Sequence, residues 1–220
     1  MAISDYNSLA AAIKTYCARN SSSAFTNSIE LFVVMAEQRF WNGSGADVND
    51  PLYCEPLNAP ELETTATVTM TDGLGDLPTD ISSLRAVRRA GDDVGLDYLT
   101  PQRWAAKDAE PQTSGDPAWY TIEGSTLKVT PSYTGSMSVL YFKRDTPLTS
   151  VTATNSILDK YPMLYFQSCL FEAFSFLQDT EAAMGHFARY RAMVAGINSS
   201  ASSVRFGGAR LKIRTRQGMP

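Results

Sequence analysis

The stretch "AWYTIEGSTLKVTPSYTGSMSVLYFKR", residues 118–144, alternates apolar and polar residues in short runs. A period of two is that of a strand with one buried face, and threonine, valine and the aromatic residues favour strands. Gly124 and Gly135 interrupt the alternation, as turn residues do. The stretch therefore predicts three short antiparallel strands.

The same period extends over the middle of the chain. Segments rich in β-branched residues occur at 64–70 and 83–90, and turn residues separate them. Together, residues 62–150 predict an antiparallel sheet of five or six strands. The motif "TPQRWAAKD" predicts one short helix within this region, with Thr100 as its cap and Pro101 at its first position.

A helical period precedes this region, within residues 1–41. The first helix is expected to follow Ser4 or Asp5, and the second to follow Thr26 or Asn27, because these residue types cap helices. The apolar stripes of the two helices are Tyr6, Leu9, Ile13 and Tyr16, and then Ile29, Phe32, Val33, Ala36 and Phe40. The opposite face of the second helix is expected to carry Glu30, Glu37 and Gln38.

The helical period returns after the strands. Residues 157–178 are apolar on nearly every side, which predicts one helix surrounded by protein. A last helix is expected from Thr180 to about residue 200, with Phe187, Tyr190, Val194 and Ile197 on one stripe. The predicted fold is α+β: a helical domain of residues 1–41 and 157–200, an inserted antiparallel β-rich domain of residues 62–150, and an extended C-terminal arm, 201–220.

Charge is distributed unevenly along the chain. Glu181 is the last acidic residue, and seven basic residues follow it, whereas the preceding part holds twelve basic and 23 acidic residues. Such asymmetry is typical of an interaction tail. Apart from these charges, the composition is that of an ordinary globular protein, with 44% hydrophobic residues.

Several function classes lack their signatures. Three separated cysteines, Cys17, Cys54 and Cys169, predict buried thiols in a reducing compartment, with no zinc site or disulfide framework. The first residues lack a signal peptide, and the most apolar window, 161–177, is too short and too polar for a membrane span. We therefore expect no cofactor, no metal and no membrane partner.

Residues that favour other chemistry have simpler structural interpretations. His186 is the only histidine, so neither a two-histidine metal site nor histidine-dependent nucleophilic catalysis is expected. "DGLGD", residues 72–76, and the nearby Asp92, Asp93 and Asp97 are expected in turns. The aromatic set is expected in the sheet core, with base or sugar stacking as the alternative: Trp104, Trp119, Tyr120, Tyr133, Tyr141 and Phe142. In "RAVRR", Arg85 and Arg89 are expected on one strand face and Arg88 on the other, either solvated or in a subunit contact.

The order of these motifs resembles that of the head-to-tail adaptor proteins of tailed bacteriophages, the tail tubular protein A-like group. The resemblance covers almost the whole chain, and its most specific pieces are "LPTDI", "YLTPQRW", "AWYTIEG" and the Tyr161–Pro162 helix start. Residues 42–60 depart from it, because this link is longer and more polar than the family's. None of the pieces is a catalytic fingerprint, so no enzyme activity is expected.

The resemblance implies a structural virion protein at the head-to-tail interface, present in the host cytoplasm during assembly. It implies a homo-oligomeric ring, usually of twelve copies, that binds beneath the portal and meets a tail or nozzle protein. DNA would pass through the ring without sequence-specific binding, in agreement with an acidic body. The alternatives are a nucleic-acid-binding protein that uses the basic tail, another tail completion subunit, and, least favoured, a hydrolase acting on cell-wall sugar.

The tail itself predicts the site. Leu211 and Ile213 alternate with basic residues, the pattern of a strand that adds to another chain's sheet edge, and Gly207 and Gly208 precede it as a joint. The alternative is a disordered solubilising end. The predicted partner-binding residues, facing the portal or a neighbouring subunit, are Arg205, Arg210, Leu211, Lys212, Ile213, Arg214 and Arg216.

Overall fold

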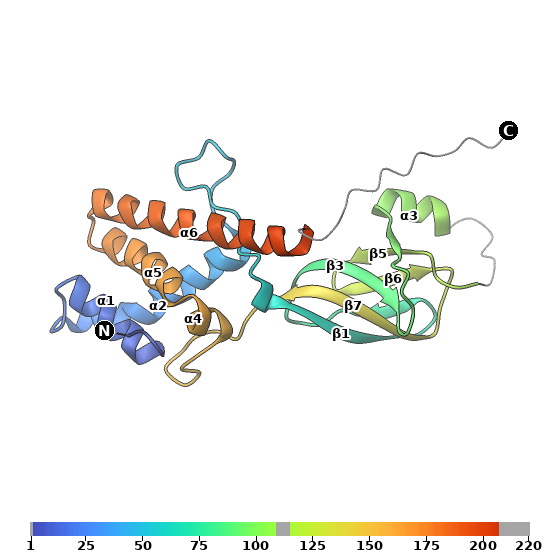
Figure 1. Cartoon of the computed structure of the whole chain (residues 1–220), viewed down its shortest axis with the longest axis horizontal. Helices are drawn as coiled ribbons and strands as arrows, with labels where there is room; N and C mark the ends of the chain where they lie inside the picture. Colours follow the sequence, from blue (N-terminus) through green and yellow to red (C-terminus); the bar gives the residue numbers. More distant parts are fainter. Residues whose placement is uncertain (1, 109–114, 207–220) are drawn as a thin grey trace. The chain divides into compact units, whose positions relative to one another are not determined.

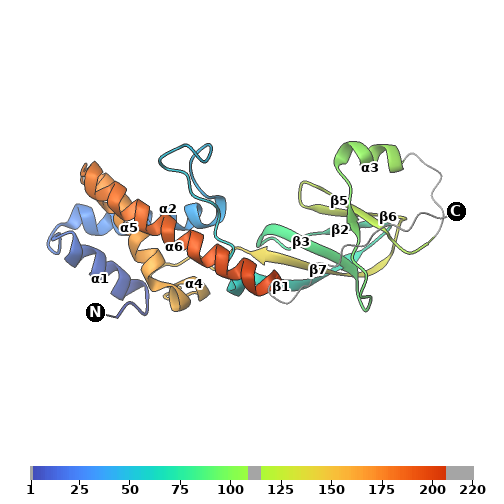
Figure 2. The same ribbon diagram turned by 45° about the horizontal axis from the view of Figure 1, so that its top comes forward.

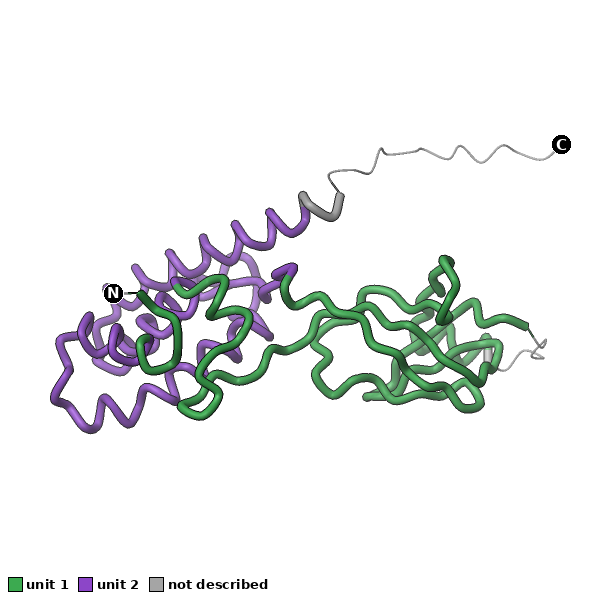
Figure 3. Tube along the Cα trace, turned by 60° about the horizontal axis from the view of Figure 1, so that its bottom comes forward, with its two compact units in different colours: residues 1–8, 61–162 green, residues 9–60, 163–220 purple. Residues whose placement is uncertain are grey.

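The computed structural model describes residues 2–108 and 115–206 and has the α+β architecture that the sequence predicts (Figure 1). The chain divides into two compact units (Figure 3). The sheet unit comprises Met1–Ser8 and Glu61–Pro162, and the helical unit comprises Leu9–Pro60 and Met163–Pro220. The helical unit is therefore built from two segments of the chain, one before and one after the strands in sequence.

Two sheets form the sheet unit. The first has the order β1 (Glu63–Met70), β7 (Gly135–Lys143) and β3 (Ile81–Arg89), with both pairings antiparallel. The second has the order β2 (Leu74–Asp76), β6 (Thr126–Thr130), β5 (Trp119–Glu123) and β4 (Asp97–Tyr98). In this second sheet, β4 pairs with β5 in parallel, and the other two pairings are antiparallel.

The prediction of a single antiparallel sheet is thus wrong, because the strands form two sheets and β4 pairs with β5 in parallel. The chain changes sheets at the turn after β1, where Asp72 and Gly73 take φ values of 50° and 79°. A two-residue turn of this kind joins antiparallel strands, yet β2 pairs with β6 and only bridges back to Thr71. Strands of two or three residues, such as β4 and β2, carry too little alternation to reveal this change.

The core of the sheet unit lies between the two sheets. The first sheet contributes Val68, Val87 and Val139, and the second contributes Leu127 and Val129, all at most 4% exposed. Alternation along each strand puts these residues on the inner faces, which is the pattern expected for two packed sheets. The short helix α3 (Pro101–Asp108) begins where predicted, because the Trp104 N–H donates to the Thr100 carbonyl at 2.8 Å.

The helical unit contains α2 (Ser23–Asn42), α5 (Pro162–Phe176) from Met163 on, α6 (Thr180–Phe206) and most of α1 (Tyr6–Tyr16). In both ribbon views α6 lies alongside α5, and the Phe171 and Phe187 ring centroids are 5.1 Å apart (Figure 2). The predicted stripe of α2 is confirmed, since all five of its apolar residues are buried. Helices from both ends of the chain therefore share one core.

Two helix boundaries differ from the sequence prediction. The helix expected over 157–178 is two helices, α4 (Ser156–Lys160) in the sheet unit and α5, because Pro162 lacks the N–H that a continuous helix requires. The last helix, α6, continues to Phe206, six residues beyond its predicted end near residue 200. A short 3-10 turn, η1 (Pro60–Leu62), precedes β1.

Capping explains the starts of the first helices. Asp5 caps α1 as predicted, and its carboxylate accepts from the Ser8 N–H at 2.7 Å. The predicted caps of α2, Thr26 and Asn27, are wrong, because the helix begins one turn earlier and Ser22 accepts from the Phe25 N–H. A sequence of four consecutive small polar residues, 20–23, offers several equivalent caps, so its pattern alone does not choose among them.

Candidate assembly surfaces

The predicted partner-binding residues lie at and beyond the end of α6. Arg205 belongs to the last turn of that helix. The other six residues, Arg210, Leu211, Lys212, Ile213, Arg214 and Arg216, lie outside the described residues. The docking arm therefore stays a prediction, and other surfaces of the described residues are candidates for assembly contacts.

A buried ion pair fixes the helices of the helical unit. The Arg39 guanidinium pairs with Glu172, and it also donates to the Ser168 hydroxyl at 2.9 Å. Its carbon atom lies 4.7 Å from the centroid of the Phe171 ring, a cation–π arrangement. Because the donors of a guanidinium have a fixed fork geometry, this contact sets the position of α2 against α5.

Further polar contacts in the same core join the helices. Glu37, expected on the outer face of α2, is instead buried, and its carboxylate accepts from the Tyr165 hydroxyl at 2.8 Å. His186 is 5% exposed, with Nδ1 2.8 Å from Gln167 Oε1, so its structural interpretation is supported. Burial lowers the pKa of His186, and the charge of nearby Arg189 lowers it further.

The outer face of α2 carries an apolar ridge. Leu31, Val34 and Met35 are 57%, 39% and 39% exposed, and their spacing places them together on one helix face. Glu30 is exposed beside them. The ridge is held in place because the opposite face of α2 forms the core of the helical unit. The helix already packs its opposite face in the core, so this second, exposed apolar cluster is typical of a contact with another protein.

The end of α2 begins a loop that lies against α6. Gly43 ends the helix at φ 69°, and a Cβ there would lie 2.5 Å from the Cys54 carbonyl, so only glycine fits. Reciprocal backbone hydrogen bonds of 2.9 Å join Ser44 and Cys54. The Asp50 carboxylate accepts from the Leu52 and Ala46 N–H groups, and these bonds lower its pKa. The long link of residues 42–60 thus forms a loop that is held by its own hydrogen bonds.

This loop and α6 enclose two adjoining hollows. One of about 330 Å³ is lined by Pro51 of the loop and by Met184, Ala188, Ala192 and Ala195 of α6. The second, about 450 Å³, reaches from Val48 and Glu55 to Ser202. Arg191 lines both. We call the first hollow the α6 groove. Its walls are mostly apolar, and its alanines have small side chains.

The basic cluster on β3 differs from its predicted arrangement. Arg85 and Arg89 were expected to share a face, but a register shift across residues 84–86 reverses the alternation. The Arg85 guanidinium lies 5.7 Å from the Phe142 ring centroid, whereas Arg89 is paired with Met137 on the opposite face of β7. The shared-face prediction is therefore wrong, and a β-bulge is the reason.

Both arginines also have acidic partners within the sheet unit. Arg85 forms a 2.6 Å ion pair with Glu63, and Arg89 pairs with Asp92 and Asp116. Arg88 is exposed on β3. Of the aromatic set, Tyr120 and Tyr141 lie in the core between the sheets, as expected, with Tyr133 packed against it. Trp104 on α3 and Phe142 are buried outside that core, and Trp119 is partly buried. A base-stacking platform is not supported by this burial.

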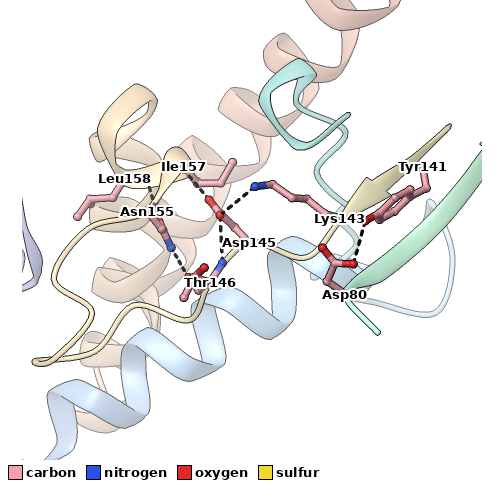
Figure 4. A network of polar contacts seen from close by, with 8 residues as sticks. All are labelled: Asp80, Tyr141, Lys143, Asp145, Thr146, Asn155, Ile157 and Leu158. Carbon is pink, nitrogen blue, oxygen red and sulfur yellow. Dashed lines mark hydrogen bonds and ion pairs between the residues drawn. The ribbon is translucent and has the colours of Figure 1, made fainter. Parts of the chain in front are cut away.

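The chain leaves β7 through a tightly bonded connection (Figure 4). The Asp145 carboxylate accepts from the backbone N–H groups of Thr146 and Ile157, at 3.0 and 3.2 Å. Asn155 caps α4 by accepting from the Leu158 N–H at 2.9 Å and donates to the Thr146 carbonyl. These bonds fix α4 against the end of the strand.

Neighbouring polar contacts extend this connection. The Tyr141 hydroxyl donates to Asp80 at 3.0 Å, and burial together with this carboxylate raises the pKa of Tyr141 to about 12 (Figure 4).

Within residues 2–108 and 115–206, no three metal-ligating side chains gather in one place. Only Asp72 and Gly73 of the "DGLGD" segment form the turn between β1 and β2, because its other three residues are β2 itself. No helix in the same ranges is long and apolar enough for a membrane span.

Comparison with known proteins identifies the family. The family model described as "SU10 adaptor protein" matches residues 4–212, which include both units. No curated protein matches the chain. The match agrees with the resemblance that the order of the sequence motifs indicates. The chain belongs to the SU10 adaptor family and is a structural adaptor of the bacteriophage virion.

Proposed function

We propose that the chain forms a closed ring of about twelve copies that joins the DNA-filled head to the tail. The ring binds beneath the portal protein and presents its other face to a tail or nozzle protein, after assembly in the host cytoplasm. The observation that carries this proposal is the adaptor-family match over residues 4–212, which spans nearly the whole chain. DNA ejection then proceeds through the ring.

The charge distribution supports a DNA channel. Before residue 182 the chain carries an excess of eleven acidic residues over basic ones. Two arginines of β3, Arg85 and Arg89, form ion pairs with carboxylates of the same chain. Affinity for DNA rises with each phosphate that a lysine or arginine neutralises. An acidic body therefore lets a polyanion pass without holding it.

The basic segment after α6 supplies the attachment in this proposal. Leu211 and Ile213 enter apolar pockets of the portal or of a neighbouring subunit, and the alternating basic residues face carboxylates. Ordering a chain costs about 1–2 kcal/mol per residue in backbone entropy, whereas an exposed ion pair contributes about 0–1 kcal/mol. Burial and strand hydrogen bonds must therefore carry most of the attachment, and repetition around a ring strengthens it.

A truncation tests this function. The chain ending at Ser203 and the full chain are mixed with tail-less, DNA-filled heads, and attachment is measured by sedimentation. We expect the truncated chain to lose attachment, while the matched control, with Arg210, Lys212, Arg214 and Arg216 changed to glutamine, retains a measurable part because its apolar residues remain. Unchanged attachment of the truncated chain would show that the arm is only a solubilising end.

DNA binding distinguishes the alternative function. The purified full chain is titrated onto double-stranded DNA at several salt concentrations. The ring proposal expects weak binding, because the acidic body opposes the basic segment. Tight binding with a steep salt dependence would instead favour a nucleic-acid-binding protein that uses its basic end.

A further inference from the structure

We infer that the α2 ridge of one copy packs into the α6 groove of the next. The ridge comprises Leu31, Val34 and Met35, and the groove is lined by Pro51, Met184, Ala188, Ala192 and Ala195. This inference rests on the proposed ring and adds to it the surfaces that join its subunits. The occupant of the groove is thus a second copy of this chain.

The residue spacing on the two surfaces matches. Leu31 and Met35 stand four residues apart on α2, and Met184, Ala188 and Ala192 repeat at the same interval on α6. Rows at this interval form the ridges and grooves of helix packing, and small side chains permit close approach of the two helices. Leu31 and Met35 are separated by about 6 Å along α2, and successive residues of the groove row are separated by the same distance along α6.

The charges beside the two surfaces are also complementary. Glu30 adjoins the ridge, and Arg191 lines the groove. In the part of the chain that the structure describes, neither side chain takes part in an ion pair. A contact between copies brings the carboxylate and the guanidinium together at its edge, where such a pair fixes the register of the two helices.

The contact joins different surfaces and therefore repeats. The ridge lies on the exposed face of α2 and the groove on the exposed face of α6, so each copy offers both a donor and an acceptor surface. A heterologous contact of this kind closes into a ring when its rotation divides a full turn. An isologous pairing of ridge with ridge would end at a dimer and would place two Glu30 carboxylates near one another.

Site-directed cross-linking tests the inference. Val34→Cys and Ala192→Cys are made singly and together in the full chain, and a short bis-maleimide is added at concentrations where native mass spectrometry detects oligomers. The native cysteines are at most 9% exposed, so the wild-type chain serves as the unreactive control. We expect the double variant to give a ladder beyond the dimer, and each single variant to stay uncross-linked.

Each outcome has a separate meaning. Dimers from Val34→Cys alone would indicate ridge-to-ridge pairing and overturn the inference. An absent ladder in the double variant, while oligomers persist by mass, would overturn the inference and leave the ring proposal standing. If the full chain stays monomeric both alone and on tail-less heads, the ring proposal fails, and the inference fails with it.

Charge exchange provides an independent readout. Glu30→Arg and Arg191→Glu each place like charges at the contact, and we expect each to raise the dissociation constant of the oligomer by about tenfold or more. The double exchange restores opposite charges and should return most of the affinity. Equal weakening by the single and the double variants would contradict the assigned pairing.

Discussion

The two units of this protein place their charged groups differently. In the helical unit, Arg39 and Glu172 form an ion pair whose side chains are only 11% and 6% exposed. In the sheet unit, the comparable pair of Arg85 and Glu63 is 28% and 25% exposed, and the core between the sheets is apolar. The helical unit thus encloses an ion pair among its helices, whereas the ion pair on the strands of the sheet unit is partly exposed. The sheet unit buries its Asp145 carboxylate beyond the end of β7, where backbone N–H groups bind it.

This difference indicates where the geometry is fixed most strictly. A buried ion pair costs desolvation energy, so it adds little net stability. If the helices move apart from the arrangement in which the pair forms, however, a buried charge is left unpaired, which is costly. The strands need no such device, because their register is set by alternation and ladder hydrogen bonds. The ridge on α2 and the groove on α6, which we propose as the contact between copies, belong to the unit with the stricter arrangement.

The largest effect is expected from Arg39→Met. This change removes the cation and leaves the Glu172 carboxylate buried without it, which costs about 3–5 kcal/mol of unfolding free energy. The measurement is urea unfolding monitored by hydrogen exchange, because exchange reports the helices and the strands separately. Exchange should accelerate in α2 and α5 first. A loss below about 1 kcal/mol would contradict the account of the buried pair.

Two of the side-chain caps, one in each unit, allow a smaller, matched comparison. Asn155→Ala removes the cap of α4 in the sheet unit, and Ser22→Ala removes that of α2. Each loses an N-cap, which contributes about 0.5–2 kcal/mol, and Asn155 also donates to the Thr146 carbonyl. We therefore expect the thermal unfolding midpoint to fall more for Asn155→Ala. Equal shifts would mean that the connection in Figure 4 adds nothing beyond the cap.

The buried histidine predicts a pH dependence confined to the helical unit. Because the pKa of His186 is lowered in the folded chain, the unfolded chain binds a proton first as pH falls below about 6.5. Stability is therefore fully present above that pH and decreases as pH falls toward the folded pKa, by at most about 1.4 kcal/mol per pH unit. Unfolding of the wild type and His186→Gln at pH 8 and pH 5.5 isolates this part. Identical pH dependences would contradict it.

The smallest effect is expected from Arg85→Met in the sheet unit. Its ion pair with Glu63 is partly exposed, so solvent screens it and its contribution is about 0–1 kcal/mol. The same urea measurement as for Arg39→Met applies, and the ratio of the two losses tests the comparison directly. A loss from Arg85→Met as large as that from Arg39→Met would remove the distinction between the units.

Sequence patterns predicted the elements that have long amphipathic repeats. The stripe of α2, the cap of α3 and the alternation of β7 are all visible in the order of residues, because burial on one face leaves a periodic trace. Pro162 was noticed as a helix start, but the apolar run on both sides of it obscured the break between α4 and α5. The long β-region was therefore recognised, while its division into two sheets was not.

Three-dimensional contacts decided what the patterns did not. Glu37 has a charged side chain that favours the surface, yet it is buried and its carboxylate accepts from the Tyr165 hydroxyl on α5. The bulge at Arg85 reverses a strand face without any glycine or proline to mark it. The α6 groove depends on Pro51, which reaches α6 only because the loop folds back through hydrogen bonds of Ser44 and Cys54. The candidate surfaces were thus beyond the reach of periodicity alone.

The mass of the adaptor layer shows whether the chain forms a closed ring on the portal. The full 24.0 kDa chain is measured by native mass spectrometry alone and after binding to purified portal protein. We predict a single closed species of about twelve copies on the portal. Val34→Asp should abolish that species, while the matched surface change Val151→Asp, at a residue 93% exposed in the sheet unit, should leave it intact. A chain that stays monomeric or dimeric in the presence of portal would contradict the account.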